Sequence, residues 1–344
     1  MRNYRLLSAS VILVIAVSMV LSALTTSRAQ DPAEPAGAKA APRQDPAKDT
    51  VKDAIKIDTN LVQLDVTVVD RFNHQIFSLN KKDFTVLENN SEQRIESVNI
   101  EPVPVSLGII IDTSESMRSK IRTIGEGAMV LVNELRPGDE AFVAQIKSKP
   151  ELVQEFTPNK DKVAKAIRGL NPGGGTSLFD AIISTAEFAR DYGKNRRKAL
   201  IVITDGLERN SRVKEKEVID ALAQFEVQCH MIGFFEEEDE PSHVFYKSPN
   251  KKATELLSRI SDDSGGRAYF PKDIFEMPGI SNQITKDLRS QYIISYYPKN
   301  DKQDGAYREV KVVINQKDKD KHNKLVARTR LGYYSKSNKS SVDR

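Results

Sequence analysis

The chain has 344 residues, with 52 basic and 48 acidic side chains, four His, one Cys and no Trp. A length of this order accommodates about two ordinary domains, and 39% hydrophobic residues argue against a wholly disordered chain. One cysteine excludes an intrachain disulfide and any cysteine-based metal cluster. The nearly balanced charge argues against a nucleic-acid-binding protein, because such proteins usually carry a large basic excess.

The N-terminal segment 1–29 has the pattern of a secretory signal peptide. Arg2 and Arg5 precede an uncharged, mostly apolar run, and the small residues Ser27 and Ala29 follow it at a cleavage site. The alternative is an uncleaved anchor, because the run is nearly long enough to span a hydrocarbon core of ~30 Å. In either case we expect the rest of the chain to be exported, to the periplasm or out of the cell. An uncleaved N-terminus would be its only contact with a membrane.

Two further segments have the composition of disordered chain. Residues 30–56 are rich in Ala, Pro and charged residues and show no apolar periodicity, so we expect a flexible linker. Residues 335–344 are short and polar, and we expect a disordered tail.

Two stretches, 57–103 and 291–334, have the alternation of half-buried β-strands. Apolar residues occupy every second position in both stretches: Val62, Leu64, Val66 and Val68 in the first, and Val310, Val312 and Ile314 in the second. Each stretch is too short to bury a core of its own. We therefore expect the two to pair into one small β domain, with the intervening residues 104–290 inserted into it.

Residues 104–290 alternate strand-like and helix-like runs. The expected strands are nearly continuous apolar segments, at 105–112, 140–146, 198–205 and 227–235. The expected helices are amphipathic, at 117–135, 159–170, 177–191, 214–225 and 252–263. This order predicts an α/β fold with a doubly wound, mostly parallel sheet covered by helices on both faces.

Polar residues follow two of these strands and one glycine-rich segment. Asp112, Ser114 and Ser116 come at the end of the first strand, Thr176 follows three glycines, and Asp205 ends a later strand. In an open α/β sheet, ligands collect at the carboxyl ends of the strands. Three hydroxyls and two carboxylates at that edge would form an all-oxygen site that suits Mg²⁺, with Mn²⁺ or Ca²⁺ as alternatives.

The residue after Thr176 has a separate expected role. Ser177 precedes a helix-like run, and Asp180 follows it three positions later, which is a capping-box arrangement. We therefore expect the Ser177 side chain to cap the helix that follows.

Together, the segments GIIIDTSESM, NPGGGTSLFDA and ITDG closely resemble those of the von Willebrand factor A domain family and its metal-ion-dependent adhesion site. The resemblance covers about 104–290. The flanking KKDFTVLENN and RLGYY are similar to an acidobacterial-type branch of the family. The resemblance implies a Rossmann-like fold and a binding protein that is not an enzyme.

The resemblance also implies roles for the five site residues. Ser114, Ser116 and Thr176 would bind the metal directly, and Asp112 and Asp205 would act directly or through water. The implied function is metal-dependent protein–protein adhesion or assembly, in which a partner protein presents an Asp or Glu carboxylate to the ion. The family's terminal disulfide, which some extracellular members carry, is excluded here by the single Cys229.

Two other functions stay open. One is a structural envelope scaffold that uses no metal, and the other is a hydrolase that uses the metal as a Lewis acid. Against a phosphatase of the haloacid-dehalogenase type, Ser114 stands where a second carboxylate is needed. The glycine-rich segment lacks the Lys of a P-loop, and none of the four histidines falls in a site segment.

The remaining features are better explained by structure than by function. We expect Cys229 and His230 to lie in a buried strand, and the acidic run 236–240 to be a solvated loop without the spacing of a calcium site. Tyr292, Tyr296 and Tyr297 are expected to pack in a sheet.

Overall fold

The structure is a computed structural model, and it describes residues 60–205, 208, 210–235, 249–315 and 325–337. The predicted signal segment 1–29, the linker 30–56 and the acidic run 236–240 lie outside the described residues. All described residues belong to one compact unit, 57–344. Among them, no helix is both long enough and apolar enough to cross a membrane.

A six-stranded sheet forms the centre of the α/β part, in the order β10-β9-β8-β5-β6-β7. Five strands are parallel, and β7 runs antiparallel to β6 at one edge. The strands are β5 (Val105–Asp112), β6 (Glu140–Ile146), β7 (Glu151–Thr157), β8 (Arg197–Thr204), β9 (Val227–Gly233) and β10 (Ala268–Tyr269). Every residue of β5 is buried, as expected for a central strand covered on both faces.

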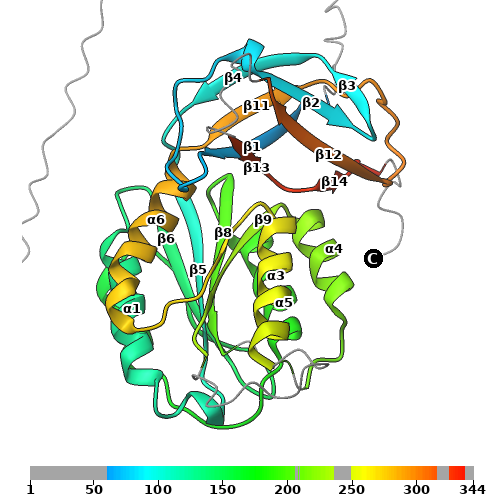
Figure 1. The fold of residues 1–344 in the computed structure, drawn as a ribbon. Coiled ribbons are helices and arrows are strands. Elements are labelled where there is room, and N and C mark those ends of the chain that lie inside the picture. The colour runs from blue at the N-terminus through cyan, green and yellow to red at the C-terminus, as the bar shows by residue number, and fades with distance from the viewer. Residues whose placement is uncertain (1–59, 206–207, 209, 236–248, 316–324, 338–344) are drawn as a thin grey trace, which may run out of the picture. The chain divides into compact units, whose positions relative to one another are not determined.

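Helices cover both faces of this sheet (Figure 1). On one face lie α1 (Ile121–Asn133), α2 (Lys160–Arg168) and α6 (Met277–Arg289). On the other lie α3 (Leu178–Tyr192), α4 (Glu215–Phe225) and α5 (Pro249–Asp263). Short 3-10 turns are η1 (Lys81–Asp83), η2 (Glu115–Met117) and η3 (Ile274–Glu276).

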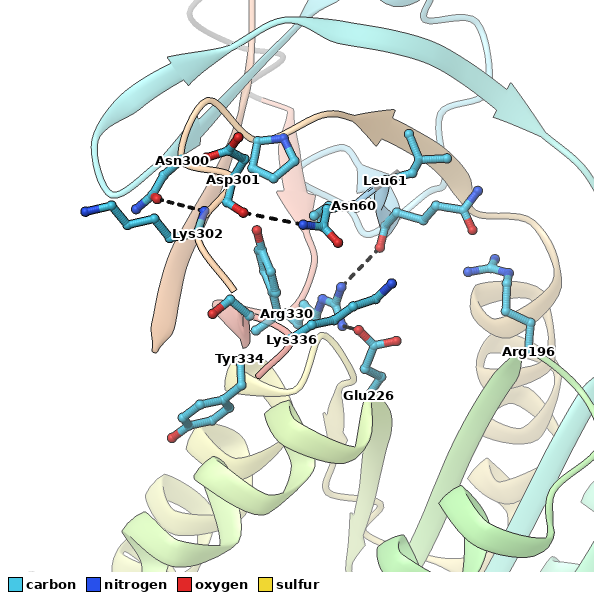
Figure 2. A pocket seen from close by; sticks show the side chains of 15 residues that line it. Asn60, Leu61, Arg196, Glu226, Asn300, Asp301, Lys302, Arg330, Tyr334 and Lys336 are labelled. Carbon is cyan, nitrogen blue, oxygen red and sulfur yellow. Dashed lines mark hydrogen bonds and ion pairs between the residues drawn. The ribbon is translucent and has the colours of Figure 1, made fainter. Parts of the chain in front are cut away.

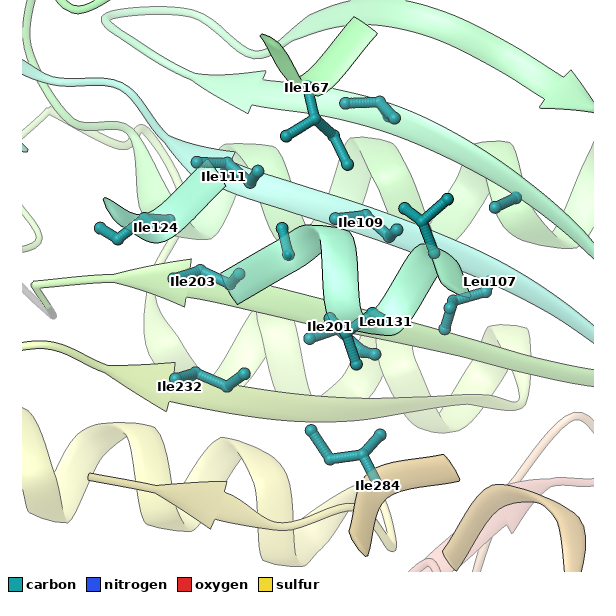
Figure 3. Close-up of a cluster of buried hydrophobic side chains, with 14 of the residues drawn as sticks. Leu107, Ile109, Ile111, Ile124, Leu131, Ile167, Ile201, Ile203, Ile232 and Ile284 are labelled. Atoms are coloured by element: carbon teal, nitrogen blue, oxygen red, sulfur yellow. The ribbon is translucent and has the colours of Figure 1, made fainter. Parts of the chain in front are cut away.

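Alternate residues of the central strand pack into two separate cores. Ile109 and Ile111 belong to the core beneath α1, α2 and α6, which Figure 3 shows, while Ile110 belongs to the core on the α3 side. The side chains of a strand point to opposite faces in turn, so one apolar run supplies both cores. This is why β5 reads as a continuous hydrophobic segment.

Strands from both flanks of the α/β part make two further sheets. One has the order β13-β1-β11-β4 and the other β14-β12-β2-β3. The strands are β1 (Val62–Val69), β2 (Phe84–Glu88), β3 (Ser91–Gln93), β4 (Ile95–Ile100), β11 (Tyr292–Tyr296), β12 (Tyr307–Ile314), β13 (Val326–Arg328) and β14 (Gly332–Tyr334). The C-terminal strand β11 pairs with the N-terminal strands β1 and β4, and the C-terminal strand β12 pairs with β2. The predicted fold class, an α/β fold inserted in a small β domain, is therefore confirmed.

The small β domain has its own apolar core, and a group of buried hydrogen bonds crosses that core. Val62, Leu64, Val66, Val68 and Val310 are buried there, as their alternation predicted. Tyr296 of one sheet and Tyr333 of the other both donate to the buried carboxylate of Glu88, at 2.9 and 2.8 Å. These bonds join the two sheets across the core and satisfy a carboxylate that would be costly to bury alone.

Several elements differ from the sequence prediction. Strands β7 and β10 and helix α6 were not expected, and α1 begins at Ile121 because residues 115–117 form the 3-10 turn η2. Tyr292 and Tyr296 are buried in the sheet, but Tyr297 is exposed. Pairing at the C-terminus continues past 334, since Ser335 N donates to Ala306 O and Ser337 forms a bridge with Asp304.

Candidate functional site

The candidate site lies at the carboxyl ends of two neighbouring strands. Asp112 is the last residue of β5, and Asp205 directly follows β8. These strands are parallel and hydrogen-bonded to each other, with Ile111 opposite Ile203. Parallel neighbours end at the same edge of a sheet, so both carboxylates reach one place although they are far apart in sequence.

Hydrogen bonds connect four of the five predicted site residues. Ser114 N donates to Asp112 Oδ1 at 2.9 Å, and the hydroxyls of Ser114 and Ser116 lie 3.1 Å apart. The Ser116 hydroxyl in turn donates to Asp205 Oδ2 at 2.6 Å. Asp112, Ser114 and Asp205 are buried. The sequence spacing therefore places these side chains in one continuous cluster of oxygen atoms.

Thr176 lies on a separate loop next to the Ser114 loop. The loop is tied to the Ser114 loop by two backbone bonds, Glu115 N to Gly174 O at 3.2 Å and Gly173 N to Thr113 O at 2.7 Å. Gly174 has a φ of 91°, a backbone conformation that favours glycine. Thr176 itself is buried, and its carbonyl accepts from Asn210 N. The glycines thus allow the close approach of two loops.

Sequence reasoning missed Thr204, which belongs to the cluster. Its hydroxyl donates to Asp112 Oδ2 at 2.8 Å, and its side chain is fully buried. Its position directly before Asp205 was the signal available, because it lies on the same strand end. With Ser114 N on the other oxygen, Thr204 fixes the orientation of the Asp112 carboxylate.

The cluster is electrostatically unfavourable for its acidic groups. Burial raises the pKa of Asp112 above its ordinary value, hydrogen bonds from Ser114 and Thr204 oppose that rise, and the charge of Asp205 adds to it. Within the described residues, no basic side chain hydrogen-bonds to Asp112. Two carboxylates and several hydroxyls, all oxygen donors, fit a small hard cation such as Mg²⁺. Such an ion would offset the repulsion between the two carboxylates.

The predicted capping role of Ser177 is wrong. Ser177 is the residue before α3, but its hydroxyl donates to Ser148 O at 2.7 Å and makes no cap. The N-terminus of α3 is instead capped from the loop after β8, where Ser211 Oγ and Glu208 Oε2 accept from Phe179 N. Asp180 accepts from the backbone of that same loop. The loop that follows Asp205 is therefore held against the helix that follows Thr176.

The other sequence candidates lie away from this cluster. Cys229 and His230 are buried in β9, as expected. In the described part of the chain, no group of three or more His, Cys, Asp or Glu side chains is arranged to hold a metal. A cation at the candidate site would therefore depend on hydroxyl oxygens as well as on the two carboxylates.

Comparison with protein families matches this same segment. Residues 107–208, which run from β5 past Asp205, match the family model of the von Willebrand factor type A domain. This segment is therefore similar to von Willebrand factor type A domains. The matched residues include all five predicted site residues. No curated protein matches the chain.

Solved structures with a similar fold include several proteins of low sequence identity. The conserved hypothetical protein BatB from Bacteroides thetaiotaomicron is 19% identical, with 53% of this chain and 98% of that chain covered and a TM-score of 0.43. A von Willebrand factor type A protein from Catenulispora acidiphila is 13% identical, with coverages of 81% and 75% and a TM-score of 0.46. The vWF domain of the type V pili tip protein Mfa5 from Porphyromonas gingivalis is 13% identical, with coverages of 55% and 97% and a TM-score of 0.42.

Proposed function

We propose that the von Willebrand A domain of this chain is a divalent-metal-dependent protein-binding domain that mediates adhesion or assembly. The observation that carries the proposal is the hydrogen-bonded cluster of Asp112, Ser114, Ser116 and Asp205 at the carboxyl ends of β5 and β8. Adjacent parallel strands supply the two Asp residues, and the loop that carries Thr176 is hydrogen-bonded to the Ser114 loop, which supports the proposal.

The proposed ligands of the ion are Asp112, Ser114, Ser116, Thr176 and Asp205. Mg²⁺ is the preferred ion because it takes oxygen ligands and retains waters, with Mn²⁺ and Ca²⁺ as alternatives. Bound there, the metal would supply a coordination position for an Asp or Glu carboxylate of the partner protein. Thr204 and Ser114 N would orient the Asp112 carboxylate for this role.

We propose binding and not catalysis for a geometric reason. A serine nucleophile is most often activated by a histidine within hydrogen-bond reach. Here the Ser114 hydroxyl contacts Ser116, and the Ser116 hydroxyl donates to the carboxylate of Asp205. The two histidines that the structure describes lie elsewhere: His230 is buried in β9, and His74 lies in the small β domain, paired with Asp70. The hydroxyls are thus arranged as oxygen donors to a shared centre.

We also propose that the protein is exported, on the basis of the signal-like segment 1–29. The partner would then be a protein of the envelope or of the cell exterior. With a single Cys, the chain cannot form an intrachain disulfide in that oxidising setting.

Manganese binding tests the metal site directly. We expect Mn²⁺ to bind the full chain with one site by calorimetry or electron spin resonance, and Mg²⁺ to compete for it. Ser114→Ala and Asp112→Asn should each weaken binding at least about tenfold, because each removes an oxygen ligand or its charge. Ser184→Ala, an exposed serine on α3, is the matched control. Failure of the wild-type chain to bind Mn²⁺ would leave the metal-free scaffold as the better explanation.

Partner capture tests the function itself. Immobilised protein should retain an envelope protein in the presence of Mg²⁺, release it with EDTA, and fail to retain it as Asp112→Asn. Turnover of a phosphate ester by the wild type, lost in the same variant, would instead support the metal-assisted hydrolase.

A further inference from the structure

A cavity lies at the opposite end of the six-stranded sheet from the candidate metal site. It has a volume of about 220 Å³ and lies between the small β domain and the α/β part (Figure 2). Arg196 directly precedes β8 and Glu226 directly precedes β9, so the cavity borders the amino ends of these strands. Asp205 follows the other end of β8. A strand of this length spans roughly 25 Å, so the two places are separate.

The cavity is large enough for a small organic molecule. An apolar cavity of about 150 Å³ holds a benzene molecule, and this one is larger and polar. Its wall is assembled from stretches far apart in the sequence, including Asn60 before β1, the loop at 300–302 and the segment 330–336. Asn60 Nδ2 donates to Asp301 O at 3.5 Å, and this bond links two of those stretches.

The lining carries an excess of positive charge. Its Arg, Lys, Asp and Glu side chains are four basic and two acidic ones: Arg196, Lys302, Arg330, Lys336, Glu226 and Asp301. A small adjoining pocket shares Arg196, Glu226 and Arg330 with the cavity. That pocket adds more basic than acidic side chains, namely Arg197, Lys198 and Asp65. The walls of the cavity would therefore attract an anion.

Arg330 is held in place to present its guanidinium. It donates from Nη1 to Glu226 Oε1 at 2.6 Å and from Nη2 to Gln63 O at 3.2 Å, and its side chain is only 14% exposed. A guanidinium has five N–H donors, and these two bonds leave others for a ligand. A fixed Arg loses little side-chain entropy on binding, and its planar group matches carboxylate and phosphate.

The backbone conformation of Glu226 is a second sign, beside the hydrogen bonds of Arg330, that this part of the cavity wall has a function. It follows α4 with a φ of 55°, in the left-handed region where helices commonly carry glycine. A residue with a side chain costs roughly 1–2 kcal/mol in that conformation. The chain bears this strain at the lining residue whose carboxylate binds Arg330.

We propose that this junction cavity binds a small, multiply charged anion, carrying carboxylate or phosphate groups, against Arg196, Lys302, Arg330 and Lys336. The anion would lie between the two structural parts of the chain and contact both. Its binding is independent of the metal site.

The test is a calorimetric titration of the full chain with citrate and, separately, with pyrophosphate. The two probes distinguish carboxylate from phosphate as the preferred group, and triethyl citrate, a neutral ester of the same body, should not bind. Lys302→Gln and Lys336→Gln should each weaken binding at least about threefold. Lys252→Gln, an exposed lysine on α5, should leave binding unchanged.

Two further variants complete the experiment. Glu226→Gln keeps a side-chain oxygen that can accept from Arg330 and removes a negative charge from the wall. It should therefore strengthen binding, an effect that misfolding would not produce. Asp112→Asn should bind both anions as the wild type does, which separates this cavity from the metal site. Absence of heat with both probes at millimolar concentration would overturn the proposal. Equal weakening by Lys252→Gln and by the two cavity variants would also overturn it, since the attraction would then be that of the whole surface.

Discussion

Arg197 Nη2 donates to Asp65 Oδ1 at 2.7 Å, which joins the first residue of β8 to the middle of β1. The Arg197 side chain is 1% exposed, and that of Asp65 is 19% exposed. Arg196 adds a second contact to the same carboxylate, at 2.8 Å. One acidic side chain thus binds two adjacent cations at the junction of the α/β part and the small β domain.

Loss of this carboxylate should destabilise the whole chain. Asp65→Ala leaves the buried Arg197 guanidinium without its carboxylate partner and with only the backbone acceptor Leu288 O. Breaking a buried pair costs about 3–5 kcal/mol in free energy of unfolding. Urea denaturation followed by circular dichroism measures this. Glu126→Ala, which removes an exposed pair with Arg122, should cost less than about 1 kcal/mol. Equal effects of the two variants would contradict the role given to the junction pair.

His230 should make stability depend on pH. Burial, with the charges of Arg267 and Arg328, lowers the pKa of His230 to about 3 from an ordinary 6.5. The unfolded chain therefore binds a proton below pH 6.5 that the folded chain does not. Stability should fall by up to about 1.4 kcal/mol for each pH unit between 6.5 and 3.

The matched variant for this titration is His230→Leu. It removes both the proton uptake and two buried ring nitrogens that have no hydrogen-bond partner among the described residues. Urea midpoints at pH 7.5 and pH 5 should differ less in the variant than in the wild type. The same pH dependence in both proteins would assign it to other groups.

Replacing either of two glycines with alanine should change the stability of the protein, in opposite directions. Gly174→Ala places a side chain at a φ of 91° and should destabilise the loop by roughly 1 kcal/mol. It should also weaken Mn²⁺ binding, because this loop carries Thr176. Gly125→Ala, inside α1, meets only Ile167 at ordinary contact distance and should stabilise by about 0.5–1 kcal/mol. Thermal melts and a Mn²⁺ titration of both variants would show whether the loop geometry matters to the site.

The single cysteine should report on unfolding. Cys229 is fully buried in β9, and burial raises the pKa of its thiol. Because the thiolate is the reactive form, a thiol reagent should label the native protein only at the rate at which β9 is exposed. The labelling rate should rise in Asp65→Ala and fall in Gly125→Ala. Fast labelling of the wild type without denaturant would show local opening at this strand.

The sequence alone was sufficient to predict those elements whose structure is determined by a local pattern of residues. Apolar runs located β5, β6, β8 and β9, and hydroxyls and carboxylates directly after strands indicated which side chains would converge. The pairing of flanks followed from the inability of either to bury a core alone.

The elements missed have weak local patterns for physical reasons. Strand β7 is an exposed edge with few buried residues, and the inner face of α6 includes Ser281, Asp287 and Arg289, which a search for apolar periodicity does not count. Asp287 accepts there from Gln283 on the same helix, and also from Tyr269 and from Gln75 of the small β domain, two partners distant in sequence. The cap of α3 by Ser211 and Glu208 is hidden for the same reason.

The pairing of β1 with β11 also constrains the order of folding. Gln63 and Ser295 hydrogen-bond across this pair although they are 232 positions apart in the chain. During synthesis or export, β1 emerges long before its partner and stays without its final neighbour until the entire α/β part has followed. Loops of that length close slowly unless the intervening chain is already compact. We therefore expect the small β domain to close last, after the α/β part has folded.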